Sequence, residues 1–203
     1  MNSIITIARQ YGSGGREVGM KLSEKLGIPF YNRELITMSV EKSGMSHDVL
    51  ADVDEKAANS LLYTLAVGSS MMHTSLPHNI PINDKLFLLQ CEVIRELADK
   101  GPCIIVGRCG DYVLQKYTNC IKTFIYADFD DRVKRISERN DVDESKARDL
   151  VIKTDKRRAN YYNYYSGQKW GKLENYNLAL NTSVIGIDGA VDVLANYVSV
   201  FEK

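Results

Sequence analysis

The chain has 203 residues, enough for one full hydrophobic core with a small inserted lobe, and its apolar and charged fractions of 44% and 26% are typical of a globular protein. Its 26 basic residues equal its 26 acidic residues, which excludes a global basic field for binding nucleic acid. The four cysteines form no Cys-x-x-Cys pair and have no histidine at ligand spacing, which argues against a zinc site or a disulfide framework and predicts reduced thiols.

The N-terminal stretch combines a β-branched run with a glycine cluster. Residues 4–8 predict a strand, and the amphipathic pattern of Val18, Leu22 and Leu26 predicts a helix that ends near Gly27. The turn between them contains Gly12, Ser13, Gly14 and Gly15. Glycine backbones can approach a ligand closely, and the first amides of a helix point at anions, so the turn predicts a phosphate site. The alternative is a turn that only packs a helix on a sheet.

The spacing departs from the standard phosphate loop, Gly-x-x-x-x-Gly-Lys-Ser/Thr. When Gly14 is taken as the second glycine, Gly15 falls at the lysine position, Arg16 at the hydroxyl position and Glu17 one residue further on. The cation would then come from Arg16, from Arg9, or from both. Glu17 would either bind magnesium or only favour the positive helix end, and no residue is assigned to a metal. The dinucleotide fingerprint fails because Glu17 stands where its third glycine is needed.

Residues 28–100 predict a short buried strand at 28–31, followed by two helices and the loop between them. Asn32 is a candidate helix cap, and Asn32 and Arg33 follow the strand end, where side chains can face a site. Residues 46–66 predict a helix, residues 68–83 a long loop, and residues 84–100 a helix that closes at a Gly-Pro pair.

The apolar run at 103–106 predicts a central parallel strand covered on both faces. Ligands sit beyond the carboxyl ends of such strands, so Arg108 is expected beside the glycine turn as a clamp for phosphate or carboxylate. The alternative is that Arg108 only pairs with a nearby acid.

The last third predicts strands at 121–126 and 178–181 and a closing helix at 189–201. Between the strands, Arg132, Arg135 and Arg139 share one helical face, which is either a solvated stripe or part of a lid. A second basic cluster includes Arg157 and Arg158. Two such helices joined by a polar hairpin would form a lid over polyphosphate. The tyrosines at 161–165 favour packing over stacking on a base.

The order of these elements resembles the nucleoside monophosphate kinases, and the whole chain resembles the cytidylate kinase-like family. The resemblance rests on residues 5–17, 30–36, 105–108, 155–162, 167–171 and 178–182. It implies an α/β, P-loop NTPase-like three-layer fold with a central parallel sheet. Within a single domain over residues 1–203, it implies a helical acceptor lobe near 32–100 and an arginine-bearing lid near 137–160.

The family resemblance also implies ATP and Mg²⁺ as cofactors, with arginines on the phosphates. By position these are Arg108, Arg135, Arg157 and Arg158. The acceptor-site acid of cytidylate kinases is replaced by Asn32, and the acid beside the Gly-Arg pair is missing.

The expected function is ATP-dependent phosphoryl transfer to a nucleoside monophosphate, CMP or dCMP by resemblance, or to another small acceptor. The alternatives are a nucleotide-binding regulatory or structural protein without kinase activity, and a protein in which the turn only packs. With no basic leader and no apolar run approaching ~20 residues, we expect a cytoplasmic protein with no membrane or nucleic-acid partner. Nothing in the sequence specifies an oligomeric state.

Overall fold

The computed structural model describes residues 2–32, 34–43 and 82–203. The chain divides into two compact units, residues 1–32 with 94–203 and residues 33–93. The second unit contains α2 (Glu34–Ser43) and most of α5 (Ile82–Asp99), with Lys42 and Glu92 3.3 Å apart. Helix α5 confirms the helix predicted at 84–100. Arg33 and the predicted helix at 46–66 lie outside the described residues, as does the predicted loop at 68–83 except for its last two residues, which begin α5.

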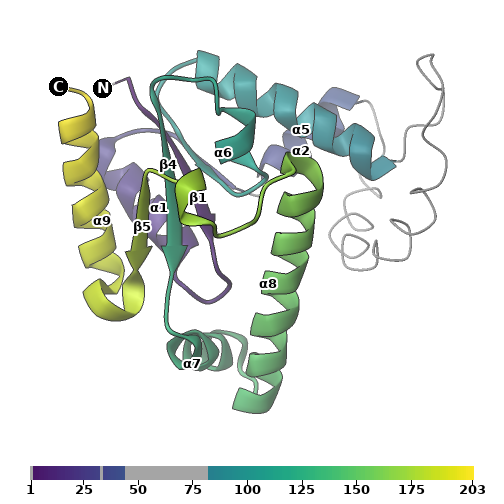
Figure 1. Cartoon of the computed structure of the whole chain (residues 1–203), viewed down its shortest axis with the longest axis vertical. Helices are drawn as coiled ribbons and strands as arrows, with labels where there is room; N and C mark the ends of the chain where they lie inside the picture. Colours follow the sequence, from purple (N-terminus) through teal and green to yellow (C-terminus); the bar gives the residue numbers. More distant parts are fainter. Residues whose placement is uncertain (1, 33, 44–81) are drawn as a thin grey trace. The chain divides into compact units, whose positions relative to one another are not determined.

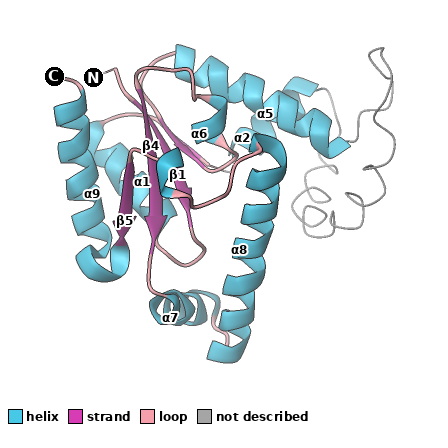
Figure 2. Cartoon of the chain, viewed as in Figure 1, coloured by secondary structure: helices cyan, strands magenta, loops and turns pink. Residues whose placement is uncertain are grey.

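A five-stranded parallel sheet forms the centre of the first unit (Figures 1 and 2). The order is β2-β3-β1-β4-β5, and every neighbouring pair is parallel. The strands are β1 (Ile4–Arg9), β2 (Phe30–Tyr31), β3 (Ile104–Val106), β4 (Cys120–Tyr126) and β5 (Leu178–Asn181). All carboxyl ends therefore meet at one edge, as the sequence predicts. The strand expected at 28–31 is shorter than predicted, and its two residues are half-buried rather than buried.

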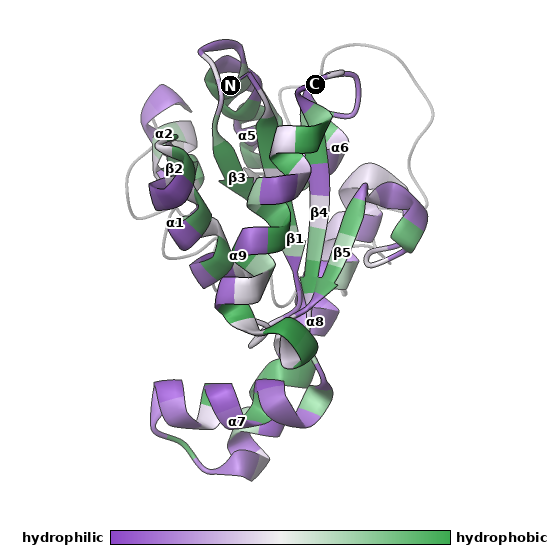
Figure 3. Ribbon diagram, turned by 90° about the vertical axis from the view of Figure 1, so that its left-hand side faces the viewer, coloured by the Kyte–Doolittle hydropathy of each residue, from purple (hydrophilic) through white to green (hydrophobic). Residues whose placement is uncertain are grey.

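Helices cover both faces of the sheet. A Cβ on Gly19 of α1 (Gly15–Leu26) would meet Ile7, whereas a Cβ on Gly110 of α6 (Gly110–Val113) would meet Thr6. Adjacent residues of a strand face opposite ways, so α1 and α6 lie on opposite faces. Helix α9 (Thr182–Phe201) packs beside α1. The predicted three layers are confirmed, and Figure 3 shows the hydrophobic colour concentrated on the strands.

A helical hairpin projects from the sheet edge and consists of α7 (Phe129–Asn140) and α8 (Glu144–Ser166) (Figure 1). It has its own small core of buried residues, Val133, Ile136, Ala147 and Val151, separate from the larger core around the sheet. The Asp143 carboxylate caps α8 by accepting from the Lys146 N–H at 2.8 Å. A 3₁₀ turn, η1 (Leu173–Asn175), follows α8 and leads to β5.

Helix α9 corrects two expectations. It begins at Thr182, seven residues before the predicted start, and contains a non-helical break at Gly186 with φ 69°. Its mean hydropathy reaches 1.5 over 18 consecutive residues, so the helix also meets the length and composition of a membrane span, contrary to the expectation that no run approaches one. In the structure one side of α9, including Leu194, packs in the sheet core, and Asp188 pairs with Lys21 of α1 at 2.7 Å. A core helix of a soluble protein meets the same criteria.

Candidate functional site: a glycine turn and an arginine hairpin

The turn between β1 and α1 requires glycine at two positions. Gly12 and Gly14 have φ values of 81° and 77°, which side-chain-bearing residues rarely adopt. A Cβ on Gly12 would stand 2.8 Å from the carbonyl oxygen of Arg132, and one on Gly14 would stand 2.8 Å from Ile187. The backbone therefore passes closely between α7 and α9, and its path is fixed by these contacts.

The first turn of α1 offers backbone amides that no side chain caps. Gly14 is the N-cap residue and makes no side-chain hydrogen bond to the helix. The first N–H groups of an α-helix have no acceptor within the helix, and the macrodipole adds positive potential there. The only acid in this turn, Glu17, is exposed and lies 3.5 Å from Lys21 on the next turn. This arrangement is suited to binding an anion.

The back of the glycine turn is held by the neighbouring strands. The Ser13 hydroxyl lies 2.9 Å from the Gln10 carbonyl and 3.1 Å from the Ile125 carbonyl, and the Thr182 hydroxyl donates to the Ser13 carbonyl at 2.8 Å. The Ser13 side chain therefore faces the protein interior. If Ser13 binds a ligand, as the sequence predicts, it does so through its backbone amide and not through its hydroxyl.

The hairpin arginines contact the glycine turn, which rules out a solvated stripe. Arg132 pairs with Asp155 of α8 at 2.5 Å, and the other Asp155 oxygen accepts from the Tyr11 N–H at 2.7 Å. Arg132 also donates to the Tyr11 carbonyl at 3.3 Å. Arg135 donates to the Gly12 carbonyl. These bonds tie both helices of the hairpin to residues 11 and 12.

Two arginines contact the Tyr11 ring. The Arg139 guanidinium carbon is 5.2 Å from the ring centroid, and this residue donates to the Tyr11 hydroxyl at 2.8 Å. The Arg158 guanidinium carbon is 5.5 Å from the same centroid. These distances fit cation–π contacts, which hold both side chains near the turn.

A cluster of arginines lies at the carboxyl edge of the sheet. Arg158 donates to the Arg9 carbonyl at 2.8 Å. Burial, and secondarily the charges of Arg158 and Arg108, hold the pKa of Arg9 well below its usual range. Burial also lowers the pKa of Arg158 to about 10, although Asp155 acts in the opposite direction. All three arginines are half-buried. Like charges gathered in such a setting are costly, and an anion bound among them would offset that cost.

Arg108 follows β3 in an unusual backbone conformation. Arg108 and Cys109 have φ values of 53° and 54°, in the left-handed region, although neither is glycine. Such strain is concentrated at functional sites. Arg108 lies close enough to Arg9 for its charge to contribute to the lowered pKa of that residue.

Other predicted site residues are less closely engaged. Arg16 is exposed on α1. Arg157 is exposed on α8 and donates to the Thr154 hydroxyl at 3.3 Å. Asn32 is half-buried after β2, at the same edge of the sheet as Arg9. Arg33 lies outside the described residues.

The sequence reasoning missed two residues that organise the turn. Asp155 and Thr182 lie in segments that carry the family resemblance, but neither was assigned a role in the turn, where both act by accepting from or donating to loop backbone. Only the position of Asp155 next to the basic run at 156–158 could have suggested its role. In the tyrosine run, Tyr162 packs as expected and is buried with its hydroxyl donating to Asp111 at 2.7 Å, whereas Tyr164 is exposed.

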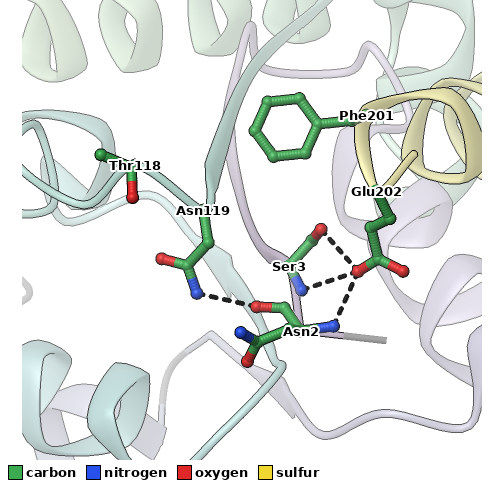
Figure 4. A pocket seen from close by; sticks show the side chains of 6 residues that line it. All are labelled: Asn2, Ser3, Thr118, Asn119, Phe201 and Glu202. Atoms are coloured by element: carbon green, nitrogen blue, oxygen red, sulfur yellow. Dashed lines mark hydrogen bonds between the residues drawn. The ribbon is translucent and has the colours of Figure 1, made fainter.

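A polar hollow of about 420 Å³ lies elsewhere, at the amino ends of β1 and β4 (Figure 4). There the Glu202 carboxylate accepts from the Asn2 and Ser3 amides at 2.7 and 2.9 Å, and from the Ser3 hydroxyl at 2.6 Å. The carboxyl ends of the strands carry the glycine turn and the arginines. The hydrogen bonds of Glu202 therefore connect the two ends of the chain. The hollow lies at the opposite edge of the sheet from the candidate site.

Comparisons with known proteins agree with this geometry. The fold and the glycine turn define a P-loop kinase-like protein. The cytidylate kinase-like family model matches residues 4–184, so the chain belongs to that family. A cytidylate kinase of Ignicoccus hospitalis is 21% identical over 95% of this chain and 96% of its own length. A cytidylate kinase of Saccharolobus islandicus is 22% identical over 98% of this chain and 93% of its own length.

Solved structures extend the comparison. A crystal structure of an uncharacterized protein from Eubacterium ventriosum is similar with a TM-score of 0.72 and 29% identity, and the match covers 97% of this chain and 98% of that one. A shikimate kinase from Bacteroides thetaiotaomicron is similar with a TM-score of 0.55 and 14% identity, and the match covers 98% of this chain and 99% of that one. These matches confirm the predicted P-loop kinase fold.

Proposed function

We propose that the chain binds ATP at the glycine turn and transfers its terminal phosphoryl group to a nucleoside monophosphate or another small acceptor. The observation that carries the proposal is an uncapped helix N-terminus next to Arg9, Arg108 and Arg158. The names of the relatives make CMP or dCMP the first acceptor to test.

In the proposed complex, the amides of Gly12 to Arg16 hold the β-phosphate. The side chains of Arg9 and Arg16 supply charge in place of the loop lysine, while Arg108 and Arg158 face the terminal phosphate from the sheet edge and from α8. Arg135 and Arg157 complete the cationic set from the hairpin. An arginine has five N–H donors, so Arg135 can hold the Gly12 carbonyl and still offer others to phosphate.

The chemistry asks for alignment and charge neutralisation rather than a covalent intermediate. An acceptor oxygen attacks the terminal phosphorus, and the bond to the bridging oxygen breaks so that ADP leaves with the electron pair. The guanidinium groups offset the negative charge that the transferred group carries. The hairpin limits the access of water when it lies over the turn.

The side chains of the turn do not fit a protein-held Mg²⁺. Arg16 occupies the hydroxyl position of the standard motif, Glu17 pairs with Lys21, and the Ser13 hydroxyl is committed to backbone carbonyls. Within residues 2–32, 34–43 and 82–203, no group of three or more His, Cys, Asp or Glu gathers. We therefore assign no step to a metal, and Mg²⁺ would arrive on the phosphates of the nucleotide.

The altered loop also favours a second candidate function, nucleotide binding without transfer. Gly15 stands at the lysine position, so a mobile cation that follows the transferred group is missing. In that case ATP would raise the melting temperature of the protein, with no turnover of any acceptor.

One screen separates the two candidates. The chain is incubated with ATP, Mg²⁺ and a panel of nucleoside monophosphates and small hydroxyl acceptors, and ADP release is measured alongside ATP affinity by calorimetry. Transfer predicts ADP release with one acceptor and a loss of at least about 100-fold in Arg158→Gln. Arg148→Gln, which changes an exposed arginine paired with Asp130, is the matched control. ATP binding without ADP release supports the second candidate, and failure to bind ATP refutes both.

A further inference from the structure

The side chain of Arg9 is enclosed by two glycines from different elements. A Cβ on Gly15 would stand 2.6 Å from the Arg9 Cβ and 3.0 Å from its Cγ. A Cβ on Gly107 would collide with Arg9 Nη1. Real Cβ atoms almost never approach other heavy atoms within 3.0 Å. The stem of Arg9 therefore needs glycine at 15, and its guanidinium lies against the backbone of Gly107.

The positions of Arg9 and Gly15 match the two ends of the standard motif. In Gly-x-x-x-x-Gly-Lys, the second glycine corresponds to Gly14, so the first glycine corresponds to position 9 and the lysine to position 15. This chain has an arginine where the motif has glycine and a glycine where it has lysine. The Arg9 stem takes the space that a lysine stem at position 15 would need. The arginine at position 9 and the glycine at position 15 therefore depend on each other.

The Arg9 guanidinium lies among positive charges. Of the residues that the structure describes, no carboxylate pairs with it, and the charges that act on it are those of Arg158 and Arg108. Gly15 begins helix α1, and the contact with Arg9 is the closest one that a Cβ there would make, ahead of the Ile125 Cβ at 3.2 Å. A half-buried arginine that stands beside like charges, with no carboxylate to pair with among the described residues, destabilises the ligand-free protein.

We propose that Arg9 and Gly15 are a reciprocal exchange that moves the phosphate-binding cation of the loop from helix α1 to the end of strand β1. This inference rests on the proposed function and deepens it. Arg9 binds the polyphosphate of the nucleotide through its planar fork, which suits two phosphate oxygens at once. The unfavourable setting of its charge in the ligand-free protein is relieved by that anion.

The test exchanges the two residues back. Arg9→Gly and Gly15→Lys are made singly and together, and affinities for ATP and for inorganic tripolyphosphate are measured by calorimetry. We expect Arg9→Gly to weaken both affinities about 10- to 100-fold, because a charge-assisted bidentate contact is lost. Gly15→Lys alone should lower both stability and affinity through its collision with the Arg9 stem. The double variant restores the standard motif and should bind at least about tenfold more tightly than either single variant.

A second variant covers the case in which Gly15→Lys does not fold. Arg9→Gln keeps the stem and removes the charge, so we expect it to raise the urea midpoint of the ligand-free protein while it weakens tripolyphosphate binding. A purely structural role for Arg9 would lower the midpoint instead. Arg148→Gln should change neither quantity, since Arg148 is an exposed surface arginine.

Each remaining outcome decides one of the two ideas. Unchanged tripolyphosphate affinity in Arg9→Gly overturns the exchange, as does a double variant that binds no better than the weaker single one. If the wild type binds tripolyphosphate through Arg9 but not ATP, the exchange stands and the proposed function fails. Binding of neither ligand by the wild type overturns both.

Discussion

The sheet core and the helical hairpin are stabilised in different ways. Around the sheet, fully buried residues such as Ile7 and Leu22 come from strands and helices far apart in the sequence. The hairpin has a core of four buried residues, and charged side chains such as Asp155 and Arg135 tie it to the glycine turn. Apolar burial is insensitive to salt, whereas polar ties respond to charge and to ligands. We therefore expect the sheet core to hold the glycine turn in place whether or not an anion is bound. The polar contacts of the hairpin are the ones that we expect a bound anion to change.

The largest effect is expected from the sheet core. Leu22 is fully buried between α1 and the sheet, so Leu22→Ala should lower the free energy of unfolding by about 2–5 kcal/mol. Urea unfolding followed by circular dichroism measures this loss, and the whole first unit should unfold at the lower midpoint. Met20→Ala, at an exposed site of the same helix, is the control and should cost far less. Equal losses for the two variants would contradict this account of the core.

A smaller and local effect is expected from the hairpin tie. Asp155→Ala leaves the buried Arg132 without its partner and the Tyr11 amide without its acceptor, at a cost of about 2 kcal/mol. Hydrogen exchange should speed up over α7 and α8 but not over β1. Asp149→Ala removes an exposed acid of the same helix, paired with Lys153, and should leave exchange unchanged. Faster exchange spread evenly over the sheet would show that the two regions are not energetically distinct.

The smallest effect on stability is expected near the C-terminal end of α8, where Tyr162 donates to the buried carboxyl of Asp111. Burial raises the pKa of Asp111 above its ordinary 3.8, with the Tyr162 hydrogen bond opposing. The folded state then binds more protons than the unfolded state, so this group lowers stability as pH rises from about 4 toward 7. Asp111→Asn keeps an acceptor for Tyr162 and should abolish that decline.

The pH dependence is measured as the difference in urea midpoint between wild type and Asp111→Asn across this range. The variant should become the more stable protein as pH rises. Asp130→Asn, at an exposed acid, is the control and should follow the wild type. A constant difference between Asp111→Asn and the wild type would mean that folding does not raise the pKa of Asp111.

Much of the fold could be predicted because local patterns specify it. The apolar runs at 4–8, 103–106 and 121–126 predicted parallel strands, and the four-residue spacing from Val18 to Leu26 predicted α1. The family resemblance placed the elements in order, and the family match confirmed it. The early start of α9 was missed because its break at Gly186 interrupts the helical pattern.

The sequence by itself determined that glycines gather after the first strand, that a lysine is missing from that turn, and that arginines cluster in two later segments. These are properties of residue type and spacing, which act over a few residues. Only the tertiary structure decided that Arg9 fills the space beside Gly15 and that Asp155 holds the Tyr11 amide. Such contacts join residues six and 144 positions apart, and their geometry depends on how the strands and the hairpin pack.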